Sequence, residues 1–235
     1  LHNLNISTTL NALSTKSEYT SSHYRGFPSG EFHTPNFAAE VYLKPTKNTD
    51  VKRLVGFLLS ANYSWNDIYL ADLSVRFDGS SEFGSEQKWA PFWSGGVGIN
   101  IHKYNFLKDS QIINQLKLRM SYGQTGKVNF PAYSAATKYA TYDRWYTTGF
   151  GVYLRALGNP NLKWETTNKL NVGTDLTFWK ERVNIVFDYY HNKTVDLITD
   201  VTLPGSAGFS SYKDNLGETL NEGVDLQVRF DVYRD

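Results

Sequence analysis

Apolar and polar residues alternate along most of the chain, so that every second residue is apolar. In one run Tyr69, Ala71, Leu73, Val75 and Phe77 alternate with Asp72, Ser74 and Arg76. Similar runs cover 3–12, 53–65, 93–101, 116–122, 164–178, 183–191 and 224–232. This alternation is typical of β-strands with one wet and one dry face, and no window shows an apolar stripe at helical spacing. The pattern predicts an all-β, antiparallel chain of about eight strands.

The lengths of the runs and of their connections favour a membrane barrel over a soluble sandwich. Many runs reach about ten residues, which is the length of a tilted membrane-spanning strand. The connections at 65–68 and 179–182 are tight turns. Long polar loops are expected near 14–51, 79–91, 125–161 and 195–219. Short turns at one edge and long loops at the other are typical of outer-membrane barrels.

Aromatic residues fall near the ends of the predicted strands, on the apolar face. At the loop ends these are Phe77, Trp93, Tyr122, Trp164 and Tyr189, and near the tight turns they are Trp65, Tyr69 and Phe178. Aromatic girdles of this kind mark the two water interfaces of a bilayer. We therefore predict that these eight residues form the membrane girdles.

The opposite face carries charges of both signs. Its members are Asp72, Arg76, Asp78, Lys117, Arg119, Lys163, Glu165, Lys169, Asp175, Asp188, Asp225, Arg229 and Asp231. Because an Arg or Lys facing lipid near the midplane costs about 2–4 kcal/mol, these charges must face water, an enclosed domain or one another. We expect Arg119 to pair with an acid on a neighbouring strand. The same face carries Gly56, Gly96, Gly98, Gly123 and Gly173, which favours the wall of a wide barrel.

Composition narrows the classes of protein further. The chain has 235 residues and a mean hydropathy of -0.44, which excludes a bundle of transmembrane helices. A net charge of +1 gives no reason to expect nucleic acid as a partner, and zero cysteines exclude disulfides and thiol chemistry. Because alternation reaches both ends of a chain that starts at Leu1, we expect a fragment of a longer protein.

Candidate chemistry is sparse, and we expect no enzyme, cofactor or metal site. The histidines are dispersed, without metal-ligand spacing: His2, His23, His33, His102 and His191. The long loop at 133–153 is different, because it is rich in aromatic side chains. Its candidate substrate contacts are Tyr139, Tyr142, Arg144, Trp145 and Tyr146, which suit stacking on sugar rings or gripping a peptide. The alternative is that these tyrosines pack on each other.

Several motifs resemble those of the SusC/RagA family of TonB-linked outer-membrane transporters. The segment 74–84, with Arg76, Asp78 and Gly84, resembles the RxDGSSxFG signature, although Phe77 interrupts it. The segments 116–126 and 159–167 resemble LKLRxSYGxTGN, with Lys127 in place of the last Asn, and NPxLKWETT. The segments 188–198 and 215–225 resemble DYYxxxTxDLL and NxGxxxNxGxE.

The resemblance implies a bacterial outer-membrane protein with a barrel of about 22 strands. Residues 1–235 would belong to the later half of that barrel, and the plug domain and TonB box would be absent from this chain. The implied function is active import of oligosaccharides or peptides, powered through the TonB complex. A SusD-like surface lipoprotein would act as a lid, and the bilayer and lipopolysaccharide would surround the wall. The motifs lie at strand ends and loop bases, so we interpret them as structural.

Two alternatives from other classes stay open on the residues alone. One is a passive porin or an adhesion-type outer-membrane barrel, which lacks a plug. The other is a soluble carbohydrate-binding β-sandwich, whose strands also have one wet and one dry face.

Overall fold

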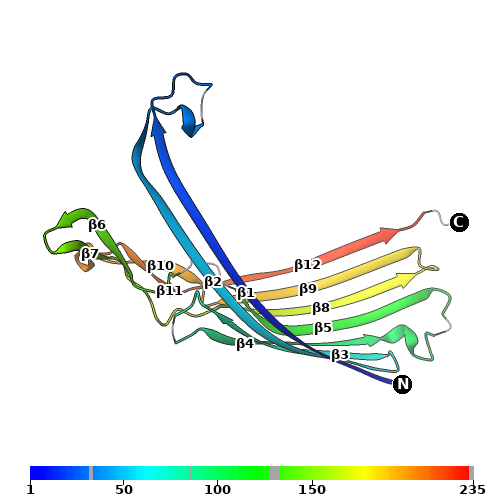
Figure 1. The fold of residues 1–235 in the computed structure, drawn as a ribbon. Coiled ribbons are helices and arrows are strands. Elements are labelled where there is room, and N and C mark those ends of the chain that lie inside the picture. The colour runs from blue at the N-terminus through cyan, green and yellow to red at the C-terminus, as the bar shows by residue number, and fades with distance from the viewer. Residues whose placement is uncertain (32–33, 85, 109, 128–132, 233–235) are drawn as a thin grey trace.

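A computed structural model describes residues 1–31, 34–84, 86–108, 110–127 and 133–232, except the side chains of 143–146 and 150. The described chain forms one eight-stranded antiparallel sheet and two separate two-stranded hairpins (Figure 1). The prediction of an all-β, antiparallel chain with about eight main strands is confirmed.

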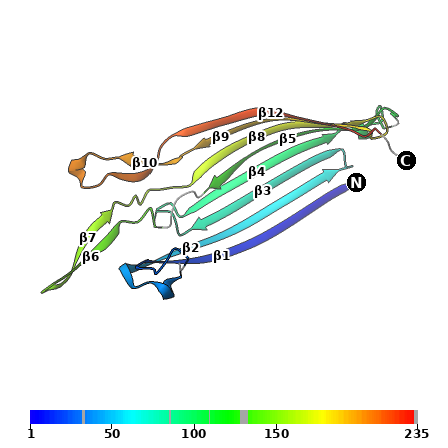
Figure 2. The ribbon, with the colours of Figure 1, turned by 90° about the horizontal axis from the view of Figure 1, so that it is seen from above.

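The sheet has the strand order β1-β2-β3-β4-β5-β8-β9-β12. Its strands are β1 (His2–Arg25), β2 (Glu40–Trp65), β3 (Tyr69–Ser80), β4 (Trp89–Asn100), β5 (Ile113–Lys127), β8 (Glu165–Phe178), β9 (Val183–Val195) and β12 (Glu218–Phe230). The hairpins are β6 (Lys138–Tyr146) with β7 (Gly149–Ala156), and β10 (Ile198–Thr202) with β11 (Ser211–Asn215). Three 3-10 turns lie at Pro35–Phe37, Ile101–Lys103 and Gly205–Ala207. The sheet is open, because its edge strands β1 and β12 do not pair with each other in the described chain. It is also curved (Figure 2).

The short connections gather at one end of the sheet, together with the N-terminus (Figure 1). Between β2 and β3, Asn66 and Asp67 take left-handed backbone angles with φ of 50° and 55°. Asn and Asp tolerate this conformation, which matches the twist of the flanking strands. The hairpins β6–β7 and β10–β11 project from the opposite end, so the predicted segregation of short and long connections is confirmed.

The strand register separates an apolar face from a polar face. Cross-strand partners on the apolar face form the row Tyr63, Ala71, Val97, Met120 and Val172. The next row on the polar face contains Arg119, Gly173 and Asp188. All of the charged residues predicted for the polar face lie there by register, except Lys163 and Asp231, which lie outside the strands.

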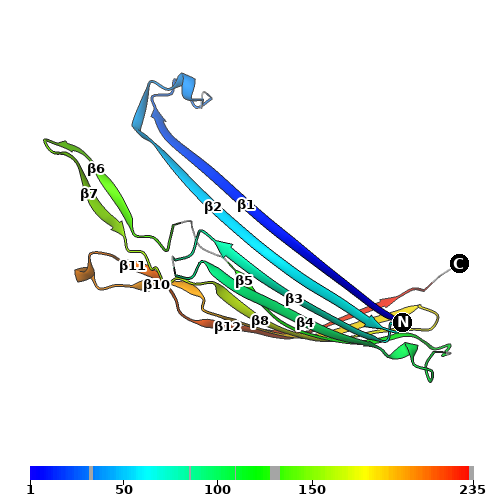
Figure 3. The same ribbon diagram turned by 60° about the horizontal axis from the view of Figure 1, so that its bottom comes forward.

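The expected loop at 14–51 is wrong, because most of it is strand. β1 continues to Arg25 and β2 begins at Glu40, so the two strands form a ribbon that rises well beyond the rest of the sheet (Figure 3). In the outer part of this ribbon, residues 14–51, polar side chains occupy most positions on both faces, so this part of the sequence shows no alternation. The expected loops at 125–161 and 195–219 likewise contain the hairpins β6–β7 and β10–β11.

Trp164 is not a girdle residue in the structure. It lies just before β8, only 6% exposed, and packs with Phe83, Phe92 and Leu162 because the loops fold back over the sheet end. The other predicted girdle residues lie on the apolar face. Trp65, Tyr69, Phe77, Trp93 and Tyr122 are exposed there, and Phe178 and Tyr189 are half-buried. Their contact with a bilayer interface stays a prediction.

In the described ranges, no helix is both long enough and apolar enough to cross a membrane.

Candidate functional site

The polar face carries a three-residue ion network that links three strands. Arg119 of β5 donates from Nη2 to Asp188 Oδ2 of β9 at 2.7 Å. Its Nε also donates to Asp175 Oδ1 of β8 at 3.3 Å. The predicted pairing of Arg119 with an acid on a neighbouring strand is therefore confirmed, and the guanidinium reaches beyond the neighbour to the next strand.

A glycine makes this reach possible. Gly173 lies between Arg119 and Asp188 in register, and a Cβ added there would lie 2.3 Å from Asp188 Oδ1 and 2.8 Å from Arg119 Cζ. An added Cβ at Gly96 would similarly lie 2.4 Å from Asp72 Oδ1. Charged side chains thus fill the space over Gly56, Gly96 and Gly173, whereas the nearest side chains to Gly98 and Gly123 are those of Leu70 and Ser94.

Hydroxyl pairs follow the polar face across the strands. Ser7 and Ser60 have their Oγ atoms 2.7 Å apart, and so do Ser74 and Ser94. The Oγ1 atoms of Thr167 and Thr194 lie 2.9 Å apart. These small hydroxyl groups are thus satisfied by one another across neighbouring strands of the polar face.

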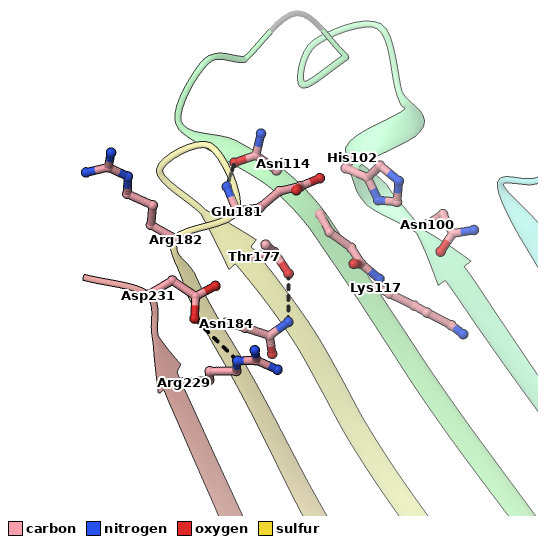
Figure 4. A pocket seen from close by; sticks show the side chains of 11 residues that line it. Asn100, His102, Asn114, Lys117, Thr177, Glu181, Arg182, Asn184, Arg229 and Asp231 are labelled. Atoms are coloured by element: carbon pink, nitrogen blue, oxygen red, sulfur yellow. Dashed lines mark hydrogen bonds and ion pairs between the residues drawn. The ribbon is translucent and has the colours of Figure 1, made fainter. Parts of the chain in front are cut away.

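A polar cavity of about 810 Å³ lies on this face near the tight turns (Figure 4). Lys117 and Arg229 supply cations, and Asp231 lies 3.4 Å from Arg229 Nε. Backbone and amide groups fix the walls: Glu181 N donates to Asn114 Oδ1 at 3.1 Å, and Asn184 Nδ2 donates to Thr177 Oγ1 at 3.2 Å. Mixed charges and amides suit binding of a polar surface, and they do not pair a nucleophile with a general base.

We find no candidate metal-ion site in the part of the chain that the structure describes. No group of three or more His, Asp or Glu side chains there is arranged to hold a metal ion.

A hydrophobic cluster at the loop end of the sheet joins segments of two of the motifs. We call Phe83, Phe92, Leu162 and Trp164 the motif cluster. The Phe83 and Trp164 rings stack with centroids 4.3 Å apart, and Leu162 is fully buried. The backbone of Gly84 donates to Leu162 O at 3.3 Å. The β3–β4 loop is therefore held against the segment that leads into β8.

Asn215 ties the β10–β11 hairpin to the same place. Its Nδ2 donates to Lys163 O at 2.9 Å and to Asp196 O at 2.8 Å, and its Oδ1 accepts from Lys163 N at 2.9 Å. Lys163 Nζ also lies 3.0 Å from Asp196 Oδ1. These contacts agree with the interpretation of the motifs as structural, and their convergence could not be read from spacing.

The candidate substrate contacts lie on the projecting β6–β7 hairpin. Tyr139 is 68% exposed and points to no partner that the structure records. Tyr142 packs on Tyr153, with ring centroids 4.7 Å apart, so this pair follows the alternative of mutual packing. The side chains of Arg144, Trp145 and Tyr146 lie outside the described residues. A role in substrate binding stays a prediction for all five candidates.

The β1–β2 ribbon carries ion pairs that the expected loop did not suggest. Lys16 Nζ lies 2.6 Å from Glu18 Oε1, and Lys47 Nζ lies 2.9 Å from Glu18 Oε2. Hydrogen bonds from Lys16 and then Lys47 lower the pKa of the Glu18 carboxyl. At the tip of the ribbon, Arg25 pairs with Glu40 and lies over the Tyr42 ring, 4.8 Å from its centroid.

Comparison with known proteins places the fold and the motifs in one family. The family model "TonB dependent receptor-like, beta-barrel" matches residues 2–234. TonB-dependent receptor P3 of Formosa agariphila is 35% identical over 209 residues, which is 87% of this chain and 21% of that protein. TonB-dependent receptor SusC of Bacteroides thetaiotaomicron is 34% identical over 194 residues, 78% of this chain and 18% of that protein.

A solved structure of the RagAB peptide transporter superposes with a TM-score of 0.87 at 26% identity, covering 100% of this chain and 26% of that chain. The chain thus spans about a fifth of the length of the curated relatives. The single curved sheet and these matches exclude the soluble β-sandwich. The chain belongs to the TonB-dependent receptor β-barrel family and is related to SusC and RagA.

Proposed function

We propose that this chain is a stretch of wall in a TonB-dependent importer of oligosaccharides or peptides in a bacterial outer membrane. The observation that carries the proposal is the two-faced sheet. One face presents a continuous apolar surface, and the other carries hydrogen-bonded hydroxyls and ion pairs over glycines. A sheet of this kind separates lipid from an aqueous interior.

Similarity to known proteins supports import as the direction of transport. One relative is SusC, and the structural neighbour is described as a peptide transporter and as a peptide importer. By that likeness residues 1–235 form part of the later half of a larger barrel, and the plug domain and TonB box belong to another part of the protein. Energy would reach the barrel through TonB, and a SusD-like lipoprotein would close its mouth.

The residues of this chain contribute contacts to import and no covalent chemistry. The polar face offers hydroxyl and amide groups to a hydrated solute, and its charges are largely satisfied within the wall. The exposed Tyr139 offers an aromatic face at the mouth, suited to a sugar ring or a peptide side chain. The polar face would therefore bind the solute weakly, and most of the affinity for the solute would come from the loops.

Uptake by living cells tests the proposal. Cells that carry the full-length protein should accumulate a fluorescent oligosaccharide or peptide, and deletion of the gene should abolish accumulation. Removal of TonB, or collapse of the proton gradient with an uncoupler, should abolish it as well. Accumulation that persists without TonB would overturn active import and support the passive porin. If neither class of cargo is taken up in a gene-dependent manner, the proposed cargo is wrong.

A further inference from the structure

The apolar face is hollowed near the tight turns. A hollow of about 480 Å³ lies across β2, β3, β4, β5 and β8. Its lining includes two outward rows of the sheet, namely Tyr63, Ala71, Val97, Met120 and Val172, and below them Tyr69, Ile99 and Leu118. The surface of the hollow is almost entirely hydrocarbon.

Side-chain size explains the hollow. Ala71 and Val97 are short, and in the same row they lie between the longer Tyr63 and Met120. Val97 is 59% exposed although it lies on a central strand, because its neighbours do not cover it. The result is a trough over Ala71 and Val97, with the longer side chains of Tyr63 and Met120 on either side of it.

The end of the hollow nearest the tight turns is polar. Tyr104, in the β4–β5 connection, donates from its hydroxyl to the Tyr69 hydroxyl at 2.7 Å. The residue before Tyr104 in the chain, Lys103, is exposed, and its Nζ lies 3.5 Å from Asp67 Oδ2 in the β2–β3 turn. Phe106 stacks on Tyr104 with centroids 5.9 Å apart and is 75% exposed, as an interfacial anchor would be.

We propose that this hollow binds one phospholipid of the periplasmic leaflet, with an acyl chain in the trough and the phosphate at Lys103 and the Tyr69–Tyr104 hydroxyls. The orientation rests on the proposed function, in which the short turns face the periplasm. The trough is continuous with the apolar face that meets the bilayer, and a hydrocarbon chain fills it without any unmet polar group. A polypeptide backbone laid along Ala71, Val97, Met120 and Val172 would leave its amide groups unsatisfied, because these side chains offer no hydrogen-bond partner.

Native mass spectrometry of the full-length protein tests the site. The protein is purified in mild detergent, stripped of lipid, and titrated with phosphatidylglycerol as the probe. The wild type should retain one lipid. Ala71→Phe, which fills the trough, should weaken retention by about tenfold or more. Ala61→Phe, one outward row away and outside the lining, is the matched control and should bind like the wild type.

Further variants separate the two ends of the ligand. Val97→Phe fills the same trough independently and should repeat the loss. Lys103→Gln and Tyr104→Phe should weaken phosphatidylglycerol severalfold and leave a neutral diacylglycerol unaffected. Equal retention by Ala71→Phe, Val97→Phe and the wild type would overturn the site. Preferential retention of lipid A, or a second copy of the protein in place of lipid, would overturn the assignment to a phospholipid.

Heat-modifiable migration on gels reports separately whether each variant forms its barrel. If the folded wild-type protein fractionates with the outer membrane and yet keeps no phospholipid, this inference alone fails. If the protein is not found in the outer membrane, the proposed function fails instead.

Discussion

At the scale of single residues, Arg119 does more than neutralise one neighbour. Its guanidinium bonds to Asp175 on the adjacent strand and to Asp188 one strand further away, across the bare backbone of Gly173. Asp188 in turn lies opposite Asp225 of β12 in register, and like charges in that position repel. Arg119 therefore offsets the repulsion among the carboxylates in this acidic part of the sheet.

Arg119→Ala should destabilise the full-length barrel by about 1–2 kcal/mol, because it leaves two half-exposed carboxylates without their cation. The measurement is the temperature at which the heat-modifiable band of the folded barrel disappears. Affinity for cargo should change less than stability. Lost uptake with unchanged heat resistance would contradict this prediction. Lys117→Ala on the same strand is the matched control, since Lys117 forms no ion pair within the described ranges.

A glycine variant tests the same network without removing a charge. Gly173→Ala places a methyl group within 2.3 Å of Asp188 Oδ1, so the ion pair must shift, at a cost of about 1–3 kcal/mol. Gly95→Ala is a fitting comparison in β4, because the nearest atom to its added Cβ lies 3.6 Å away. Equal melting temperatures for the two variants would show that the network is not sensitive to packing.

The alternation of the sequence is enough to predict which face of the sheet each of these residues lies on. Period two assigned Asp72, Arg119 and Asp188 to one face, and the register confirms that assignment. The partners of Arg119 could not be predicted, because the sequences of β5 and β8 do not determine the register in which the two strands pair. Trp164 departs from the predicted face because β8 begins only at Glu165, and the residue before it belongs to a loop that packs inward.

At the scale of elements, the motif cluster works as a clasp between the β3–β4 loop and the segment before β8. Gly84 is tightest there, since an added Cβ would lie 1.8 Å from the carbonyl oxygen of Pro160. The contact of Gly84 with Pro160 and its hydrogen bond to Leu162 O both involve backbone atoms, so rotation of a side chain cannot relieve a clash there.

Gly84→Ala should therefore open the clasp while the barrel stays assembled. We expect protease to cleave within residues 81–88 and 157–163 several times faster than in the wild type, at an unchanged heat-modification temperature. Gly205→Ala is the control, because nothing lies within 4 Å of its added Cβ. Wild-type cleavage rates in the Gly84 variant would show that the loops are not held by this contact.

The β1–β2 ribbon escaped prediction for a physical reason. In residues 14–51, the outer part of the ribbon, neither face is apolar, so the sequence lacks period two there and resembles a polar loop. Isolated two-stranded ribbons are marginally stable in water, so local ion pairs such as those of Glu18 matter there.

The ribbon should respond to acid through Glu18. Because the folded-state pKa of Glu18 is lowered, its contribution is present above the ordinary carboxyl pKa and is lost as pH falls through the lowered value. Glu18→Gln should thus speed amide exchange in 15–20 and 46–50 near neutral pH. After correction for intrinsic rates, the difference from wild type should vanish in strong acid. A difference that persists there would assign the effect to something other than the carboxylate charge.

At the scale of the whole molecule, the two ends of the sheet differ in kind, with tight turns at one and projecting hairpins at the other (Figure 3). The two-faced architecture was predictable because alternation and loop lengths are properties of the chain itself. The candidate site was less predictable. Of the aromatic loop residues, Tyr142 turned out to pack on Tyr153, and only the fold could show which tyrosines pair.

Orientation in the membrane is testable because the chain contains no cysteine. Thr147→Cys, in the turn between β6 and β7, should react with a membrane-impermeant maleimide in intact cells expressing the full-length protein. Lys180→Cys, in the tight turn between β8 and β9, should react only after the outer membrane is permeabilised. The unmodified protein provides the blank, and the reverse labelling pattern would invert the proposed orientation.

The ion network over Gly173 also bears on how the wall is assembled. If β8 paired with β5 one residue out of place, every side chain of β8 would change faces, and Asp175 would lie on the apolar face while Arg119 lost a partner. A charge exposed to the bilayer is penalised more heavily than an apolar residue exposed to water. The network of Arg119, Asp175 and Asp188 would therefore favour the observed register during assembly, because a shift of one residue separates these charges and moves one of them to the apolar face.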